Sequence, residues 1–420
     1  MVRIRFESRG VAHKVCAFWQ RGPARLIRML GAVFMAVILP AFLAGCASVP
    51  ERHPLPAVAS ETAVIPGIRW ARIWGDELPS DWDQQLAERK ASLQAQQAEV
   101  PQRPPTLLAI SGGGANGAFG AGLLNGWTAA GDRPEFTIVT GISTGALIAP
   151  FAYLGSAYDP QLKAVYTDIS TKDILRKRPK LQLITGDAAA STEPLKALIA
   201  KYVDEAMLQA IAEEFRKGRG LLIGTTNLDA ARPVIWNIGR IATSGEPKAP
   251  ALFRQVLLAS ASIPGAFPPV YIEVEANGQR YDEMHVDGGA SAQVFLYPAS
   301  LDWREVSGQM GFQGEGRVYV IRNAELEPEW KAVKPRFAPI SGRTISSLIR
   351  TQGTGDLYRI YLGARRDGLD YNLASIPADF DMEPKEPFDP AYMQALFDLG
   401  YRLAKGGYPW EKAPPGFEPP

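Results

Sequence analysis

The stretches TLLAISGGGANGAFG at residues 106–120 and FTIVTGISTGALIAPF at residues 136–151 decide the fold of this chain. Each stretch begins with a short apolar run, passes through a glycine-rich loop and continues into a segment of small and apolar residues. The apolar run is typical of a buried parallel strand, and the segment after the loop is typical of a helix. Two such units in succession predict an α/β fold with a mostly parallel central sheet and helices on both faces.

The second loop has the sequence GISTG at residues 141–145, which is a G-x-S-x-G pattern. Between a strand and a helix, this pattern forms a sharp nucleophile elbow that lifts the serine hydroxyl out of the top of the sheet. The elbow also places the serine at a helix N-terminus, where the helix dipole favours developing negative charge. We therefore predict that Ser143 is the catalytic nucleophile and that Gly141 and Gly145 support the turn.

The first loop, from Gly112 to Gly117, allows two interpretations. Consecutive glycines after a strand expose backbone N–H groups to an oxyanion, but the same residues also spell the G-x-G-x-x-G pattern of a dinucleotide-binding loop. A dinucleotide-binding unit needs an acidic residue about 20 positions further on, at the end of the next strand. Residues 141–145 place the serine elbow there instead, which favours an oxyanion hole and argues against a nucleotide.

The third candidate element is the sequence VDGG at residues 286–289. The other two histidines of the chain lie near the N-terminus, so a Ser-His-Asp triad would have to use His285. On a strand, His285 and Asp287 would share one face about 7 Å apart, which is awkward for an imidazole that must bridge a carboxylate to a serine. A direct dyad of Ser143 and Asp287 is simpler, provided that burial raises the pKa of the Asp287 carboxyl.

With a fourth block, ASASIPGAFPP at residues 259–269, these elements resemble the patatin-like phospholipase family over residues 106–292. The resemblance implies a three-layer α/β/α fold and a reaction that needs no metal or organic cofactor. It also implies that Ser143 forms the acyl-enzyme, and that Asp287 acts as the base and then activates the deacylating water. The two serines of the fourth block precede a proline turn and are expected to be structural.

The resemblance also gives roles to the glycines, with one departure from the family pattern. Gly112, Gly113 and Gly114 would supply the oxyanion hole. Four further positions would support the loops of the site: Asn116, Gly117, Gly288 and Gly289. The family usually carries Arg or Lys where this chain has Asn116, and a cation there could hold phosphate. The uncharged amide therefore leaves neutral esters open beside phospholipids as the substrate.

Residues 1–45 have the features of an export signal. A basic stretch ends at Arg28, and the apolar run that follows is shorter than the roughly 20 residues of a spanning helix. The run ends in LAGC at residues 43–46, which resembles the bacterial lipobox and implies lipidation of Cys46. Because Ala47 replaces the aspartate of retained lipoproteins, we expect an outer-membrane lipoprotein facing the periplasm. An uncleaved N-terminal membrane anchor is the alternative interpretation.

Composition divides the rest of the chain into four parts. Residues 46–66 are rich in Pro, Ala, Val and Ser and are predicted to be a tether. Residues 67–105 are predicted to be an accessory N-terminal segment that includes a polar helix. Residues 106–300 are the predicted patatin-like catalytic core. Residues 301–420 are predicted to pack on that core and to end in a proline-rich tail.

Charge and cysteine usage exclude several kinds of partner and site. Residues 1–45 carry a net charge of +6, which leaves −5 for the rest, and a mildly acidic body is a poor nucleic-acid binder. The two cysteines, Cys16 and Cys46, lie outside the predicted core, so the usual Cys/His zinc patterns cannot form. We therefore predict a lipid acyl hydrolase without a nucleic-acid, nucleotide or metal partner, anchored to the membrane through Cys46. A non-catalytic lipoprotein that binds lipid or a protein partner is the alternative, and the oligomeric state stays open.

Overall fold

The computed structural model describes residues 52–96, 104–179, 186–328 and 330–418. The predicted signal peptide and Cys46 lie outside these residues. The described chain from His53 onward forms one compact unit. None of the helices in the described part is both long and apolar enough to cross a membrane.

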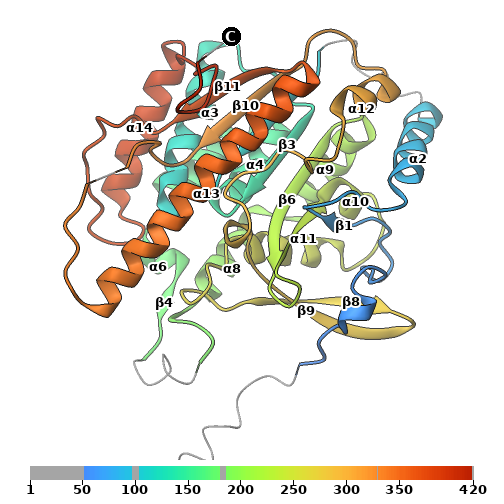
Figure 1. Ribbon diagram of the computed structural model, residues 1–420, viewed down its shortest axis with the longest axis horizontal. Helices are drawn as coiled ribbons and strands as arrows, with labels where there is room; N and C mark the ends of the chain where they lie inside the picture. The colour runs from blue at the N-terminus through green and yellow to red at the C-terminus, as the bar shows by residue number, and fades with distance from the viewer. Residues whose placement is uncertain (1–51, 97–103, 180–185, 329, 419–420) are drawn as a thin grey trace, which may run out of the picture. The chain divides into compact units, whose positions relative to one another are not determined.

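A nine-stranded sheet forms the centre of this unit (Figure 1). Five neighbouring strands run parallel in the order β6, β3, β2, β10 and β11. Their bounds are Gly220–Asn227, Ile138–Ile142, Thr106–Ile110, Arg317–Arg322 and Asp370–Ser375, respectively. β2, β3 and β10 are almost wholly buried apolar runs, because helices cover both of their faces. The predicted mostly parallel central sheet is confirmed.

Antiparallel strands extend the sheet beyond β6. β7 (Arg232–Asn237) pairs with β6, and β1 (Arg72–Trp74) forms the edge of the sheet on β7. β9 (Gln279–Asp287) pairs with the end of β6 and forms a hairpin with β8 (Val270–Ala276). The pairing of β9 with β6 brings the last residue of β9, which is Asp287, to the C-terminal end of the parallel strands.

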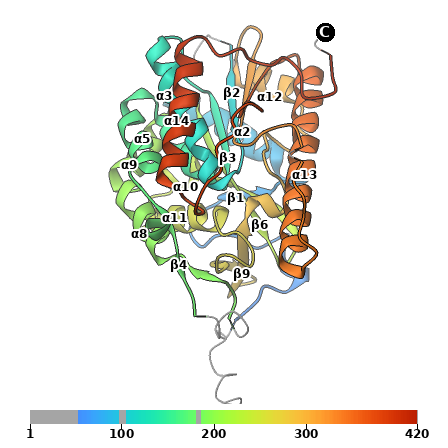
Figure 2. The same ribbon diagram turned by 90° about the vertical axis from the view of Figure 1, so that its left-hand side faces the viewer.

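Helices cover both faces of the sheet and complete three layers (Figure 2). One face carries α3, α4 and α14, and the other carries α12 and α13. Their bounds are Gly117–Ala130, Thr144–Leu154, Pro390–Lys405, Trp303–Met310 and Phe337–Asp367, respectively. Side chains alternate along each strand, so Leu108 of β2 belongs to the core under α3 while Leu107 belongs to the core under α13.

Smaller elements fill the connections between the main strands. The helices among them are α2 (Trp82–Ala95), α5 (Asp159–Thr167), α6 (Thr171–Ile174), α8 (Glu193–Tyr202), α9 (Glu205–Arg216), α10 (Ile238–Ala242) and α11 (Ala249–Ser260). A two-residue strand pair joins β4 (Arg176–Lys177) to β5 (Ala190–Ser191). Four single turns of 3-10 helix are η2 (Ala57–Ala59), η3 (Gly114–Asn116), η4 (Ser156–Tyr158) and η5 (Gly288–Ala290).

The segment predicted as a tether is bound to the body from His53 onward. The ring of His53 stacks on Tyr281 with centroids 4.7 Å apart, and the N–H of Leu55 donates to the carbonyl of Asp282 at 3.2 Å. These contacts hold the segment against the β8–β9 hairpin. From His53 onward, the described residues of the predicted tether therefore contact the body.

Two further parts of the chain are more closely built into the core than the sequence suggested. The accessory segment supplies the edge strand β1 and the helix α2, so it contributes to the sheet as well as to its surface. The C-terminal part supplies β10 and β11, which pair in parallel with β2 and with each other. The part predicted to pack on the core therefore also contributes two strands to the central sheet.

Candidate active site

The predicted nucleophile Ser143 occupies a strained turn between β3 and α4. Its backbone has φ 56° and ψ −125°, and it is one of four described non-glycine residues with positive φ. A side chain in this region costs on the order of 1–3 kcal/mol and persists only where the surrounding structure enforces it. This is the backbone geometry of a nucleophile elbow, as the G-x-S-x-G pattern predicts.

The glycines of the elbow are required by close approach of the backbone. A Cβ atom on Gly145 would collide with the carbonyl oxygen of Ile110, the last residue of β2, and one on Gly141 would collide with the carbonyl oxygen of Gly145. The elbow therefore lies directly against the neighbouring strand. Glycine at these two positions lets the loop pass between β2 and α4.

Ser260 fixes the elbow from a distant part of the chain. The backbone N–H of Ser143 donates to the Ser260 hydroxyl at 2.9 Å, and this hydroxyl donates in turn to the carbonyl of Gly224 at 2.7 Å. Ser260 is fully buried at the end of α11 and so bridges the elbow to β6. The sequence placed Ser260 among structural residues but gave no indication that it holds the nucleophile.

Asp287 meets Ser143 at the end of the sheet. Its N–H donates to the carbonyl of Ser262 at 2.9 Å, and its Oδ1 accepts from the N–H of Gly289 at 2.7 Å. Burial raises the pKa of the Asp287 carboxyl to about 6, although hydrogen bonds from the Ser143 side chain and the Gly289 N–H oppose the rise. Such a carboxylate is a stronger base than an ordinary aspartate, whose pKa is about 3.9.

His285 is turned away from this pair. It is fully buried, with Nδ1 3.0 Å from the Thr225 hydroxyl and Nε2 3.1 Å from a carboxylate oxygen of Glu283. Glu283 also accepts from Arg72 of β1 at 2.6 Å. Burial lowers the pKa of His285, despite the opposing effect of Glu283. Both ring nitrogens therefore serve a buried polar cluster, and the geometry favours the Ser143–Asp287 pair over a triad through His285.

The glycine-rich loop departs from the prediction at one position. The N–H of Gly112 donates to the carbonyl of Gln293 at 3.0 Å, so it is not available to an oxyanion in this structure. Gly112 is buried with its Cα beside Ser143, whereas Gly113 is exposed and Gly114 half-buried. The oxyanion hole of Gly112, Gly113 and Gly114 stays a prediction, in which the Gly112 N–H would first have to leave Gln293.

Asn323 holds the glycine-rich loop in place, and the sequence did not identify it. Its backbone N–H donates to the Ser111 hydroxyl at 2.8 Å, and its Nδ2 donates to the Ser111 carbonyl at 3.0 Å. Its Oδ1 accepts from the N–H of Gly120 in α3 at 3.1 Å. Asn323 follows directly after β10, and a polar residue directly after a buried parallel strand was the signal that could have found it.

The remaining predicted supports lie around the same loops. The Oδ1 of Asn116 accepts from the Tyr392 hydroxyl of α14 at 2.8 Å, so this residue pins the loop to a helix. A Cβ on Gly117 would collide with the Thr144 side chain, and one on Gly288 would lie 2.6 Å from the carbonyl oxygen of Gly224. These contacts bring the three predicted sequence blocks together around one point.

Gln293 connects the pair to the long helix α13. Its Nε2 donates to the carbonyl of Gly289 at 2.7 Å and to the Gln352 side chain of α13 at 3.0 Å. Its own carbonyl receives the Gly112 N–H, as described above. Gln293 therefore links the glycine-rich loop, the turn after Asp287 and α13, and the sequence gave no signal for this role.

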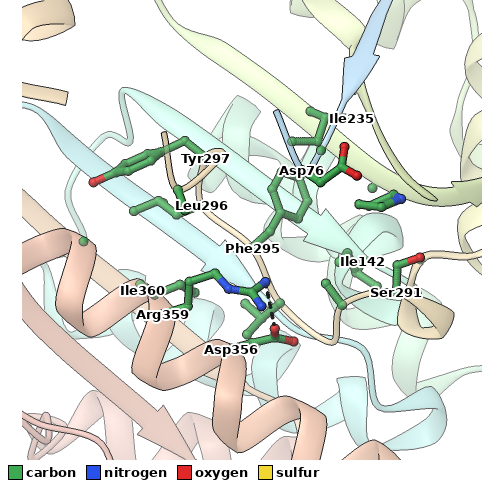
Figure 3. Close-up of a pocket in the computed structure, with 18 of the residues that line it drawn as sticks. Asp76, Ile142, Ile235, Ser291, Phe295, Leu296, Tyr297, Asp356, Arg359 and Ile360 are labelled. Atoms are coloured by element: carbon green, nitrogen blue, oxygen red, sulfur yellow. Dashed lines mark hydrogen bonds and ion pairs between the residues drawn. The ribbon is translucent and has the colours of Figure 1, made fainter. Parts of the chain in front are cut away.

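A cavity of about 550 Å³ lies next to the elbow (Figure 3). Ile142 and Gly288, the chain neighbours of the two candidate residues, line it, but Ser143 and Asp287 do not. Most of its wall is apolar, and α13 contributes an ion pair between Asp356 and Arg359 with a closest distance of 3.5 Å. The cavity therefore neighbours the candidate pair without including it.

No group of three or more His, Cys, Asp or Glu side chains in the described residues could hold a metal ion. The described site thus consists of a serine on an elbow, a buried carboxyl and an adjacent glycine-rich loop. This arrangement can transfer an acyl group through a serine ester.

Comparison with known proteins gives one family match. Residues 108–300 match the family model of the patatin-like phospholipases. VipD from Legionella pneumophila is 12% identical with a TM-score of 0.34, over 73% of this chain and 66% of that one. Human GIVD cytosolic phospholipase A2 is 13% identical with a TM-score of 0.32, over 80% and 64%. This chain thus spans slightly less than two thirds of either structure. No curated protein matches the sequence.

The family match covers every element of the candidate site that the sequence predicted. The glycine-rich loop, the elbow at Ser143, the block at residues 259–269 and the turn at Asp287 all lie within it. The three-layer architecture around a mostly parallel sheet agrees with the fold that the resemblance implied. Residues 108–300 thus match the family model of the patatin-like phospholipases, and they include the whole candidate site.

Proposed function

We propose that this protein is a serine acyl hydrolase that cleaves carboxylic esters of membrane lipids through Ser143 and Asp287. The observation that carries the proposal is the meeting of the two residues: a serine on a strained elbow contacts a buried carboxyl whose pKa is raised to about 6. The match of residues 108–300 to the patatin-like phospholipase family model supports lipid esters as the class of substrate.

In the first half-reaction, the Ser143 hydroxyl attacks the ester carbonyl carbon and its proton passes to the Asp287 carboxylate. The carbonyl π pair moves onto oxygen, and the N–H groups of Gly113 and Gly114 stabilise the resulting negative charge. Collapse of the tetrahedral intermediate then breaks the C–O bond to the alcohol, which takes the proton from Asp287. The products are a free alcohol and an acyl-enzyme on Ser143.

In the second half-reaction, the Asp287 carboxylate takes a proton from a water molecule, and the hydroxide that forms attacks the acyl carbon. Collapse of this intermediate returns the proton to the Ser143 oxygen and releases the fatty acid. A pKa near 6 suits both steps, because the carboxyl is ionised at neutral pH and its conjugate acid can still protonate the leaving oxygen. Ser260 acts as a positioning residue, since it holds the Ser143 backbone rather than the reacting atoms.

We also propose that lipidation of Cys46 anchors the protein at the outer membrane, facing the periplasm. The LAGC sequence at residues 43–46 supports this proposal, and an acyl-anchored enzyme would stay at its substrate surface. Labelling of cells with a radioactive fatty acid tests it. We expect the wild type to incorporate the radioactive fatty acid and Cys46→Ser not to do so. Equal labelling of both proteins would refute lipidation at this cysteine.

The decisive experiment is hydrolysis of p-nitrophenyl acyl esters and phospholipid vesicles by protein comprising residues 47–420. Wild type, Ser143→Ala and Asp287→Asn are compared, with unfolding temperature as the control for folding. We expect each variant to lose at least about 10³-fold in kcat/KM while remaining folded, because nucleophile and base act together. Full activity of either variant would exclude the dyad. Inactivity of the wild type on every substrate would favour a lipid-binding protein without catalysis.

A further inference from the structure

The two halves of α13 differ sharply in burial. In its second half, positions 353, 356, 357, 360, 361 and 364 are buried, which is the spacing of an amphipathic helix packed on a core. Among residues 337–352 whose burial is described, none is buried. At 1.5 Å per residue, this first half is about 24 Å long. Over this length, none of the side chains whose burial is described lies in the core. Figure 1 shows the helix continuing past the parallel strands.

The exposed half nevertheless carries large apolar side chains. Phe337 is 87% exposed and Leu348 64%, and five more large apolar residues between 330 and 349 are exposed: Trp330, Val333, Ile340, Ile345 and Ile349. At 100° per residue, the apolar residues of the helix fall within an arc of about 180°. Arg343 and Arg350 fall on the opposite side of the helix. Exposure of this face to solvent is unfavourable, because its apolar surface area then stays in contact with water.

The charge of this region is one-sided. Residues 330–350, hereafter the docking segment, contain five basic residues and no acidic residue: Lys331, Lys334, Arg336, Arg343 and Arg350. Lys331 forms an ion pair with Glu383 at 2.9 Å, and this pair neutralises one of the five charges. The chain outside the N-terminal 45 residues is acidic overall, so the docking segment contrasts with the body that carries it. Basic residues beside an apolar helix face are typical of helices that lie in the interface of anionic bilayers.

The docking segment also adjoins the candidate active site. A second cavity, of about 400 Å³, is lined both by Asn116 of the glycine-rich loop and by Ile349 and Arg350 of the docking segment. Two residues later, Gln352 bonds to Gln293 beside the Ser143–Asp287 pair. Ile349, at the edge of the apolar face, borders this cavity, which otherwise lies on the side of the helix that carries Arg350. A lipid surface on the apolar face would therefore lie beside the cavity and not over it.

We propose that the docking segment binds the surface of an anionic lipid bilayer, with its apolar face inserted between lipid head groups. The proposal goes beyond ester hydrolysis, because docking requires neither Ser143 nor Asp287. It is tested by sedimentation with vesicles, using residues 47–420 with Ser143→Ala so that lipid is not consumed. The vesicles contain phosphatidylcholine with or without phosphatidylglycerol. The test variant is Leu348→Ser. The matched control is Leu362→Ser, because Leu362 is similarly exposed, at 56%, but lies on the packed half of α13.

We expect Leu348→Ser to weaken binding to phosphatidylglycerol vesicles roughly tenfold, in line with the apolar area that it removes, and the control to bind like the parent. We also expect binding to weaken without phosphatidylglycerol and in high salt. Equal binding by all variants, or equal loss in both leucine variants, would overturn the proposal. The parent protein could instead associate with itself in the absence of lipid. If Leu348→Ser abolished such self-association, the proposal would be overturned, and the docking segment would be assigned to contact with a second copy of the chain.

A separate observation concerns Arg322, which ends β10. Its side chain is buried with 4% exposure, and it donates no hydrogen bond to any residue in the described part of the chain. Burial lowers the pKa of the Arg322 guanidinium to about 10, and the nearby Asp356 carboxylate opposes part of this decrease. A buried arginine without a hydrogen-bonded partner is costly, so such a group usually serves a ligand.

Arg322 lines the cavity of about 400 Å³ that contains Asn116. Arg343 and Arg350 line it as well, and Glu325 and Glu327 are its acidic residues, so the lining has a net positive charge. We propose that Arg322 binds the phosphate of a glycerophospholipid substrate in this cavity. This second proposal rests on the proposed function.

Two substrates of equal chain length, dioctanoyl phosphatidylglycerol and dioctanoylglycerol, differ only by the phosphate head group and so test Arg322. We compare kcat/KM for dioctanoyl phosphatidylglycerol with kcat/KM for dioctanoylglycerol. We expect Arg322→Gln to lower this ratio by about tenfold or more, mainly by raising KM for the phosphatidylglycerol, because hydrogen bonds to charged groups are strong. Arg365→Gln, on an exposed arginine of α13, is the control and should keep the ratio. An equal fall on both substrates would overturn the phosphate site alone. No turnover by the wild type would instead refute the proposed function and this proposal with it.

Discussion

Replacing Asp287 with asparagine should abolish activity and stabilise the fold. The carboxyl is buried, and its pKa is raised to about 6 in the folded protein, against about 3.9 in an unfolded chain. Ionisation of this group therefore costs the folded state on the order of 3 kcal/mol at pH 8. Asparagine has nearly the same shape, can still accept from Gly289 and never ionises, so it avoids this cost.

The sign of the pH dependence follows from the raised pKa. Below about pH 4 the carboxyl is protonated in both states, so the wild type keeps the full contribution of this group to stability. As the pH rises through 6, the wild type loses that contribution and Asp287→Asn does not. The wild-type kcat/KM should rise over the same interval with an apparent pKa near 6, because the base must be ionised.

The assay is thermal unfolding of both proteins between pH 4 and pH 8, alongside ester hydrolysis. For residues 53–420 the unfolding entropy is about 0.8 kcal/mol per kelvin, so 3 kcal/mol corresponds to roughly 4 °C. We expect a higher Tm for Asp287→Asn at pH 8 and equal Tm values near pH 4. A variant that is less stable than the wild type at pH 8 would refute the argument, since burial would then not dominate at this carboxyl.

Two further variants test the positioning of the site. Ser260→Ala leaves the Ser143 N–H and the Gly224 carbonyl without their shared partner. We therefore expect kcat to fall about 10–100-fold with little change in KM. Ser260→Thr keeps a hydroxyl and should restore part of the lost kcat. A fall in KM alone would contradict this role. His285→Gln should keep kcat/KM within about tenfold of the wild type, whereas a triad histidine would cost about 10⁴-fold or more.

Most of the local architecture could be predicted because it depends on residues close in sequence. The strands at 106–110 and 138–142 and the helices after them follow from short apolar runs, and the loops between them from glycines that permit tight turns. The elbow at Ser143 is local as well, since one strand, one turn and one helix determine it. For the same reason the sequence could place the glycine-rich loop but could not predict that the Gly112 N–H bonds to the carbonyl of Gln293.

Other parts of the fold could not be predicted from local patterns. The first half of α13 contains Pro339 and Gly342 and lacks a packed face, so its composition does not predict a 31-residue helix. The strand β11 joins the sheet only because β10 offers it a parallel edge from a distant part of the chain. The segment at residues 53–66 has the composition of a linker, yet the β8–β9 hairpin binds it.

The sequence by itself determined that a serine elbow, a glycine-rich loop and an aspartate turn occur in one α/β chain. Only the tertiary structure decided that Asp287 reaches Ser143, that Gln293 takes the Gly112 N–H and that His285 is engaged elsewhere. The physical reason is that these contacts join residues far apart in the chain. Their geometry depends on the pairing of β9 with β6 and on burial, which sets both the hydrogen-bond partners and the pKa of the base.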